Sequence, residues 1–425
     1  MGHFQAGYGI GDGGGAELFL PGAELGDAVR EAERVYGRDE AVFYDGDLYS
    51  TGLAELGEFD ELQPNRSAGG MAAAAHRACG LETYRWDEVM ALSLERAHRK
   101  LKRFFVHYGT GRRRGAPIAR YQSPSGMRSA FLTKNAKTSK GAQKRIAGVS
   151  PALSRGVNLL PHRLAAELSR KQLPLTGMGL CVGSSTACRS TCLLYSGLNP
   201  IADSQVPIKL ARTEALLKEP VAWLRMLVAA VQWHVDWCAR RSLEPYLRPN
   251  LLSDIPWERV CPELVAHLQQ VRWYDYTKVS GREYDPERYD MTFSFNGQNE
   301  RACVRELSRG IRCAVVFWLP HPCTRHRQPC DSVTELSFLG QPVLDGDLHD
   351  LRPLDPQGSV IGLSYKPVTL TPGKRAVTPP PAASKFVVPA FRDPDSGALL
   401  VAGTPAQLGS ALAFERQGPT ALTVS

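Results

Sequence analysis

The stretch Ile311-Arg312-Cys313-Ala314-Val315-Val316-Phe317-Trp318-Leu319 is the most continuous apolar run of the chain. Its centre is hydrophobic at consecutive positions, which is typical of a strand that is covered on both faces. Five other short apolar runs are strand candidates, and longer helical patterns separate most of them. These runs are 156–161, 246–252, 271–276, 289–295 and 359–366. Alternating strands and helices predict βα units around a mostly parallel sheet.

Six strand candidates are too few for an eight-stranded barrel but enough for a partial one. We therefore expect an α/β fold in which residues 126–367 form the barrel domain. Residues 1–125 are expected to be an accessory region with an acidic head and a basic helix and linker, partly disordered. Residues 368–425 are expected to be a Pro-rich linker and a small C-terminal extension, with a hairpin at 386–401 or a helix at 404–414. Apolar residues at helical spacing predict one long helix over 209–241.

Three cysteines lie within twelve residues in the segment 177–197, which is rich in Gly, Ser and Thr. They are Cys181, Cys188 and Cys192, with C-x6-C-x3-C spacing. Three converging thiolates are suitable ligands for an iron–sulfur cluster or a thiophilic metal. Buried structural thiols and disulfides are the alternatives. The first twenty residues show no secretory signal, so we expect a cytoplasmic, reducing location that disfavours disulfides.

Polar residues follow three of the predicted strands. Because the carboxyl ends of parallel strands meet at one edge, we expect these residues to form a cofactor site beside the cysteine segment. In that site Lys278 would pair with a carboxylate or phosphate, and Asp254 would accept from an amine or a ribose hydroxyl. The alternative is that they are polar only because they lie in loops. The candidates are Asn250, Ser253, Asp254, Tyr276, Lys278, Ser294, Asn296 and Asn299.

Charge is distributed unevenly along the 425 residues, although the composition, with 43% hydrophobic and 22% charged residues, is that of a soluble globular protein. Residues 1–95 hold 18 acidic and 6 basic side chains, whereas residues 96–166 hold 17 basic and no acidic ones. The basic residues of 96–145, including Arg112, Arg113 and Arg114, are candidates for contact with nucleic acid. A solvated linker that pairs with the acidic head is the alternative. The apolar stretch 221–238 carries Arg225, His234 and Asp236, so we expect no membrane span.

Two further clusters contain metal-ligand residue types. The carboxylates of Asp345, Asp347, Asp350 and Asp355 are interpreted as a hydrogen-bonded turn rather than a divalent-cation site. The set His321, Cys323, His326 and Cys330 is interrupted by prolines, which favours an irregular loop over a zinc site. The sequence has no G-x-S-x-G elbow, no Walker A loop and no H-E-x-x-H pair.

From about residue 131 to 366 the chain resembles the phage- and plasmid-encoded gene-product-88-like proteins. The resemblance rests on blocks in matching order, each of which is short. They are Asn158-Leu159-Leu160-Pro161, the three cysteines of 181–192, Ser253-Asp254-Ile255-Pro256-Trp257-Glu258, Tyr274-Asp275-Tyr276-Thr277-Lys278, Thr292-Phe293-Ser294, Val315-Val316-Phe317, Asp345-Gly346-Asp347 with Asp350, and Ile361-Gly362-Leu363.

This family is in turn similar to the radical S-adenosylmethionine enzymes. That similarity implies a partial (β/α)6 barrel in which Cys181, Cys188 and Cys192 ligate three irons of a [4Fe–4S] cluster. The fourth iron would take S-adenosylmethionine. The first functional hypothesis is therefore a mobile-element protein with an iron–sulfur barrel, of unknown substrate, whose catalytic status stays open. The second is a non-catalytic, nucleic-acid-associated protein with structural zinc or structural thiols.

Overall fold

The structure is a computed structural model that describes eleven parts of the chain. They are residues 4–8, 16–20, 68–108, 121–133, 151–161, 179–193, 206–282, 285–319, 331–365, 386–393 and 395–401. Within these residues a two-stranded antiparallel hairpin joins β1 (Phe4–Tyr8) to β2 (Ala16–Leu20). All other described strands belong to one ten-stranded sheet.

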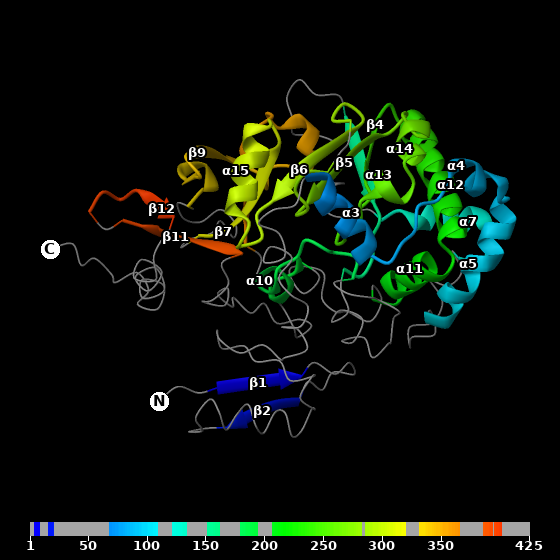
Figure 1. Cartoon of the computed structure of the whole chain (residues 1–425), viewed down its shortest axis with the longest axis horizontal. Coiled ribbons are helices and arrows are strands. Elements are labelled where there is room, and N and C mark those ends of the chain that lie inside the picture. The colour runs from blue at the N-terminus through cyan, green and yellow to red at the C-terminus, as the bar shows by residue number, and fades with distance from the viewer. Residues whose placement is uncertain are drawn as a thin grey trace.

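Seven strands of this sheet are parallel to their neighbours, which confirms the mostly parallel α/β fold (Figure 1). Their spatial order is β3 (Ala152–Gly156), β4 (Glu244–Arg248), β5 (Arg272–Thr277), β6 (Tyr289–Ser294), β7 (Arg312–Trp318), β10 (Val360–Ser364) and β9 (Gln341–Asp345). The sheet is open in this strand order, with β3 at one edge and the short β8 (Ser337–Phe338) at the other. Barrel curvature stays a prediction.

Strand β7 lies in the middle of the sheet and is covered on both faces, as its continuous hydrophobicity predicts. Side chains at both alternating sets of positions are buried, and only Val316 is partly exposed. The hairpin expected over 386–401 is confirmed as β11 (Val387–Arg392) and β12 (Leu399–Val401). The sequence did not indicate that β11 also pairs in parallel with the carboxyl end of β7, where Val387 lies opposite Val316.

Most of the described helices pack around one large hydrophobic core, whereas the helix over 300–308 packs in a second cluster. In the large core Trp223 stacks on Trp257 with ring centroids 5.5 Å apart and meets Phe131 edge-on at 5.1 Å. Helices from 68–131 share this core with those that follow β3, and the division into accessory and barrel domains stays a prediction. The helices are α3 (Ala68–Ala78), α4 (Trp86–Ala91), α5 (Leu94–Tyr108), α7 (Pro124–Phe131), α10 (Thr186–Ser190), α11 (Val206–Lys218), α12 (Pro220–Ala239), α13 (Trp257–Val260), α14 (Glu263–His267) and α15 (Glu300–Ser308).

The expectation of a single helix over 209–241 is wrong, because α11 ends at Lys218 and α12 begins at Pro220. Proline lacks a backbone N–H and disfavours helical geometry in the residue before it, so it starts a helix more readily than it continues one. Glu219, with φ −138°, is the turning point. Its carboxylate pairs with Lys100 and Arg103 of α5, both at 2.7 Å, and so ties α5 to the junction.

The first strand also differs from its expected position. Strand β3 covers 152–156, and the predicted run 156–161 is mostly a buried segment that leaves the strand end. Val157, Leu159 and Leu160 are apolar because they fill the core. The Leu160 N–H donates to Oγ1 of Thr213 on α11 at 2.9 Å, so this segment anchors α11 to the sheet.

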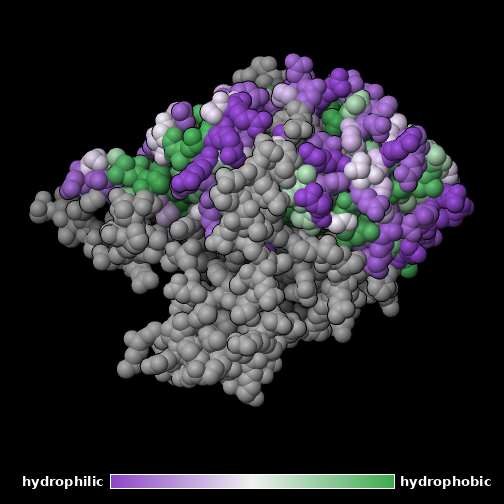
Figure 2. All heavy atoms as spheres, viewed as in Figure 1, coloured by the Kyte–Doolittle hydropathy of each residue, from purple (hydrophilic) through white to green (hydrophobic). Residues whose placement is uncertain are grey.

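In the part of the chain that the structure describes, we find no helix that is both long and apolar enough to span a membrane. Hydrophilic side chains cover the outer helices α4 and α5 in Figure 2, with small hydrophobic patches between them. Arg96, Arg99, Lys100 and Arg103 of α5 are among the exposed ones.

Candidate functional site

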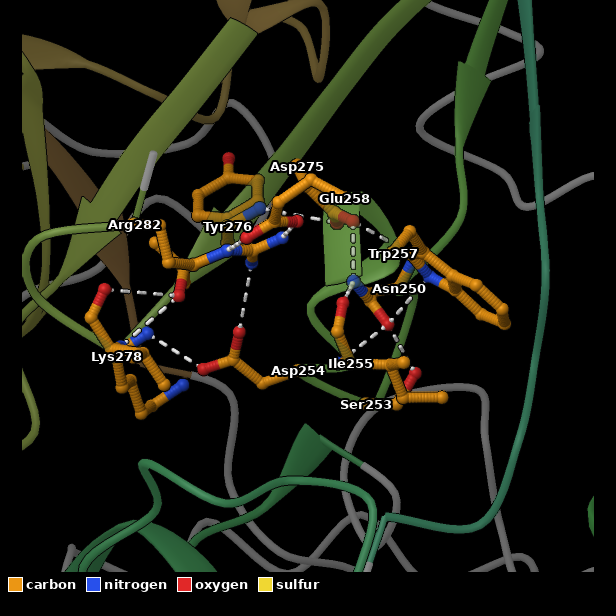
Figure 3. A network of polar contacts seen from close by, with 12 residues as sticks. Asn250, Ser253, Asp254, Ile255, Trp257, Glu258, Asp275, Tyr276, Lys278 and Arg282 are labelled. Atoms are coloured by element: carbon orange, nitrogen blue, oxygen red, sulfur yellow. Dashed lines mark hydrogen bonds and ion pairs between the residues drawn. The ribbon is translucent and has the colours of Figure 1, made fainter. Parts of the chain in front are cut away.

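Asn250, just beyond β4, is the centre of a buried hydrogen-bond network (Figure 3). Its side-chain oxygen accepts from the Ser253 hydroxyl at 2.8 Å, the Ile255 N–H at 3.0 Å and Nε1 of Trp257 at 3.3 Å. Its amide nitrogen donates to Oδ2 of Asp275 at 2.6 Å. These bonds hold the loop that connects β4 to α13, and a role of Asn250 and Ser253 in binding a cofactor stays a prediction.

Asp275 of β5 is fully buried beneath that loop. Besides Asn250, it accepts from the Tyr289 hydroxyl at 2.9 Å, and Nε of Arg248 lies 3.8 Å from its other oxygen. Burial raises its pKa to about 7, against the opposing effect of Arg248 and Arg282. The carboxyl group therefore exchanges its proton near neutral pH, which the sequence did not indicate.

Asp254 connects the β4 loop to the end of β5. One carboxylate oxygen accepts from the Lys278 backbone N–H at 2.7 Å, and the other lies 3.4 Å from Nη1 of Arg282. Arg282 is also paired through two nitrogens with Glu258. Asp254 and Arg282 are each 2% exposed, and the two carboxylates outweigh burial and raise the Arg282 pKa. Figure 3 shows the Asp254 carboxylate between Lys278 and Arg282.

The cysteine segment docks onto these strand ends. The Asp254 N–H donates to the Leu180 carbonyl at 2.7 Å. Asn296, in the loop after β6, donates from Nδ2 to the Gly183 carbonyl at 3.2 Å and accepts at its own carbonyl from the Ser185 hydroxyl at 2.6 Å. The ends of three successive strands therefore meet one loop, as the parallel topology predicts.

Two other predicted residues support the Asn296 loop. Asn299 donates to the Ser294 carbonyl at 3.0 Å, and its Oδ1 accepts from the Asn296 N–H at 2.8 Å. Tyr276 has a different neighbour. Its ring lies under the Arg248 guanidinium, whose carbon is 4.3 Å from the ring centroid. That guanidinium also donates to Asp350 at 3.2 Å, so Tyr276 belongs to a neighbouring polar cluster.

The cysteine segment influences the pKa of the Lys278 ammonium group. Cys188, Cys181, Asp254 and Cys192 together outweigh the effect of burial and raise the pKa of the Lys278 ammonium group. Burial raises the pKa of the Cys181 and Cys188 thiols, and Lys278 opposes that shift. Without a metal these two thiols are neutral near pH 7. Cys181 and Cys188 are each 8% exposed, whereas Cys192 is partly exposed.

Among the residues the structure describes, no set of three or more Cys, His, Asp or Glu side chains is gathered as a metal site. The carboxylates after β9 form a turn: Asp345 accepts from the Asp347 N–H at 2.8 Å, and Asp347 accepts from the Ser364 N–H at 2.7 Å.

Several predicted features lie outside the described residues. They are the set His321, Cys323, His326 and Cys330, the basic residues Arg112, Arg113 and Arg114, and the helix at 404–414. A cavity of about 600 Å³ lies near the amino ends of β6 and β7, between Asp290, Ile311 and Gln357, and extends to Arg282. Arg282, which pairs with Asp254, lines this cavity, whereas none of the described residues of the cysteine segment does.

Comparison with known proteins gives a single assignment. The family model described as gene product 88 matches residues 129–372, which include every strand end described above. Neither the curated proteins nor the solved structures include a match to the chain. Because the matched residues make up more than half of the sequence, the chain belongs to the gene product 88 family.

Proposed function

We propose that this protein is a mobile-element protein that holds an iron–sulfur cluster through Cys181, Cys188 and Cys192. The observation that carries the proposal is the docking of the three-cysteine segment on the carboxyl edge of a parallel sheet, through the Leu180 and Gly183 carbonyls. This edge is where α/β proteins place their ligand sites.

The donor set suits the cluster chemically. Three thiols with no histidine are the soft ligands that iron–sulfur clusters use, and they must be deprotonated to bind. Lys278 opposes the effect of burial and lowers the pKa of both the Cys181 and Cys188 thiols, and Arg189 also lowers that of Cys188. Two cations therefore favour the thiolate forms. Ligation requires the three sulfurs to move together, because the described residues hold no gathered set of three ligand side chains.

The chain's own residues would position the iron–sulfur cluster and shield it from water. Asp254 and Asn296 fix the cysteine segment to the strand ends, and Gly183 lets it approach β5 closely. A bound cluster would supply one-electron chemistry, while the protein excludes water and orients the substrate. S-adenosylmethionine is the cofactor we propose for such a site, with the Lys278 ammonium group as the partner of its carboxylate.

Metal analysis tests this proposal directly. Protein purified or reconstituted without oxygen should contain iron and sulfide, with broad visible absorption. Replacing Cys181, Cys188 or Cys192 with serine should remove most of the iron. Cys79→Ser is the matched control, since Cys79 is also buried and its Sγ donates only to the His76 carbonyl, which a hydroxyl can replace. Colourless, iron-free wild-type protein after reconstitution would overturn the proposal.

Nucleic-acid contact is the second candidate function. The exposed face of α5 carries Arg96, Arg99, Lys100 and Arg103, of which Glu219 pairs with two. The combined Arg96→Gln and Arg99→Gln variant should bind DNA or RNA more weakly, with a shallower dependence on salt. If its affinity and salt dependence equal those of the wild type, α5 has no such role.

A further inference from the structure

The cavity of about 600 Å³ near the amino ends of β6 and β7 has no role in the iron–sulfur proposal. Its size is that of a small-molecule site, since such pockets usually enclose about 300–1,000 Å³. The turn before β6, the first residues of β6, the junction of α15 with β7, and Gln357 before β10 all contribute to its lining. The chemistry of these side chains defines the ligand that would fit.

Apolar side chains form part of the cavity wall. They are Pro286 of the turn, Met291 of β6 and Ile311 before β7. Gly310 also lines the cavity, and no heavy atom lies within 4 Å of the position that its Cβ would take. Its φ of +81° is the left-handed conformation that glycine commonly adopts after a helix. An apolar ligand group placed against these residues would be removed from water, which favours binding.

Most polar groups in the lining already have partners. Asp290 accepts from Nη1 of Arg312 at 2.7 Å. The Gln357 amide donates to the Gly310 carbonyl at 2.8 Å and accepts from Nη2 of Arg312 at 3.3 Å. Arg282 uses all three of its guanidinium nitrogens on two carboxylates. These groups are satisfied within the protein and leave little capacity for a ligand.

Arg309, at the end of α15, is the exception. Its Nη1 donates to Glu306 at 2.9 Å, whereas its Nε and Nη2 have no partner among the residues that the structure describes. The other oxygen of Glu306 accepts from the Ser280 hydroxyl and from the Gly281 N–H at 3.1 Å. Nε and Nη2 form an edge of the guanidinium that can bind a carboxylate through two parallel hydrogen bonds. The Arg309 side chain is 46% exposed, so a ligand can reach it from solvent.

We infer that this cavity binds a small monocarboxylic acid with an apolar body, whose carboxylate pairs with Nε and Nη2 of Arg309. The apolar body would lie against Met291 and Ile311. A single negative charge is the better match, because the Asp290 carboxylate belongs to the same lining and would repel a dianion such as phosphate more strongly. The site does not depend on the iron–sulfur proposal, because none of the described residues of the cysteine segment lines the cavity.

Calorimetric titration with two compounds that share one apolar body tests the site. They are hydrocinnamate, which is a carboxylate, and hydrocinnamyl alcohol, which is neutral. The wild type should bind hydrocinnamate at least about tenfold more tightly than the alcohol, as expected for charge-assisted hydrogen bonds to arginine. Arg309→Gln should remove this preference and leave the affinity for the alcohol unchanged. Arg301→Gln, at an exposed position of the same helix and outside the lining, should bind both compounds as the wild type does.

Ile311→Trp is a second variant, which fills the cavity and should abolish the binding of both compounds. Circular dichroism without ligand checks that it folds, and the Arg309 comparison decides alone if it does not. Hydrocinnamate should raise the melting temperature of the wild type but not that of folded Ile311→Trp. The inference is overturned if the wild type binds neither compound or binds both equally, if Arg309→Gln keeps the preference for the carboxylate, or if Ile311→Trp binds as the wild type does. None of these readouts involves iron, so a failure of the cluster proposal is seen separately in the iron content.

Discussion

Gly183 of the cysteine segment lies directly against Lys278 at the end of β5. A Cβ atom on Gly183 would lie 2.5 Å from Cβ of Lys278 and 2.9 Å from its carbonyl carbon. Neither contact can be relieved by rotating a flexible side chain, because both atoms are at or next to the backbone. Glycine at this position is therefore the condition for bringing the cysteines to the strand end.

Gly183→Ala should separate the cysteine segment from β5. We expect the free energy of unfolding to fall by about 1–3 kcal/mol, which is typical of overpacking a buried contact. The iron content after anaerobic reconstitution should fall as well, because the cysteines no longer face Lys278. Denaturant unfolding and iron analysis measure the two effects.

Gly397→Ala is the control for this variant. Gly397 has φ +69° and no heavy atom within 4 Å of a built Cβ, so alanine there adds backbone strain without a clash. Its cost should be about 1 kcal/mol, with iron content unchanged. Equal iron content in both variants would show that the contact with Lys278 does not position the cysteines.

The buried Asp275 carboxyl should make stability depend on pH. Burial raises its pKa from 3.8 to about 7, so the folded state favours the protonated form. Its stabilising contribution is fully present below about pH 3.8 and is lost as the pH rises through 7. The free energy of unfolding should therefore decrease between pH 5 and pH 8 in the wild type more than in Asp275→Asn.

Urea unfolding at several pH values between 5 and 8 measures this difference. Asp236→Asn is the control, because Asp236 is exposed on α12 and its change should leave the pH profile of the wild type intact. A profile for Asp275→Asn that parallels the wild type would mean that Asp275 is ionised throughout this range.

The fold and the meeting of the strand ends could be predicted because they follow from local patterns. Continuous hydrophobicity identified β7, and parallel pairing then required Asn250, Lys278 and Asn296 to lie at one edge. Strand β9 was missed because its first residues, Gln341 and Pro342, are polar or exposed and give no apolar run.

The electrostatics of the site could not be predicted, because burial of a charge has no local signature. Arg248 and Asp350 are 102 residues apart in the sequence and pair at 3.2 Å. Lysine and arginine side chains on helices are usually exposed to solvent. The sequence therefore gives no sign that Lys209 and Arg212 of α11 are buried. Only the tertiary packing of α11 against α5 and α12 shows that they are enclosed.

Glu258→Gln should destabilise the link between the β4 loop and the end of β5. The Glu258 carboxylate accepts from two nitrogens of Arg282, whose side chain is 1% exposed. In the variant, Asp254 is the only carboxylate that still pairs with the buried Arg282. We expect a loss of about 3 kcal/mol in the free energy of unfolding, as for a broken buried pair. Asp87→Asn breaks the exposed Arg85–Asp87 pair and should change the free energy of unfolding little, because water screens that pair. Similar losses in both variants would contradict the structural role of Arg282.

Asn250→Ala should be the most destabilising single change at the site. It leaves three buried donors without their acceptor, from Ser253, Ile255 and Trp257, and removes a donor to Asp275. Each unsatisfied buried group costs about 1–3 kcal/mol, so a total loss above about 3 kcal/mol is expected. Trp257 fluorescence should change in the folded state, since its Nε1 loses its partner. Gln269→Ala, at an exposed position, should have little effect. A loss below about 1 kcal/mol with unchanged fluorescence would show that the loop after β4 is held by its backbone contacts with the cysteine segment instead.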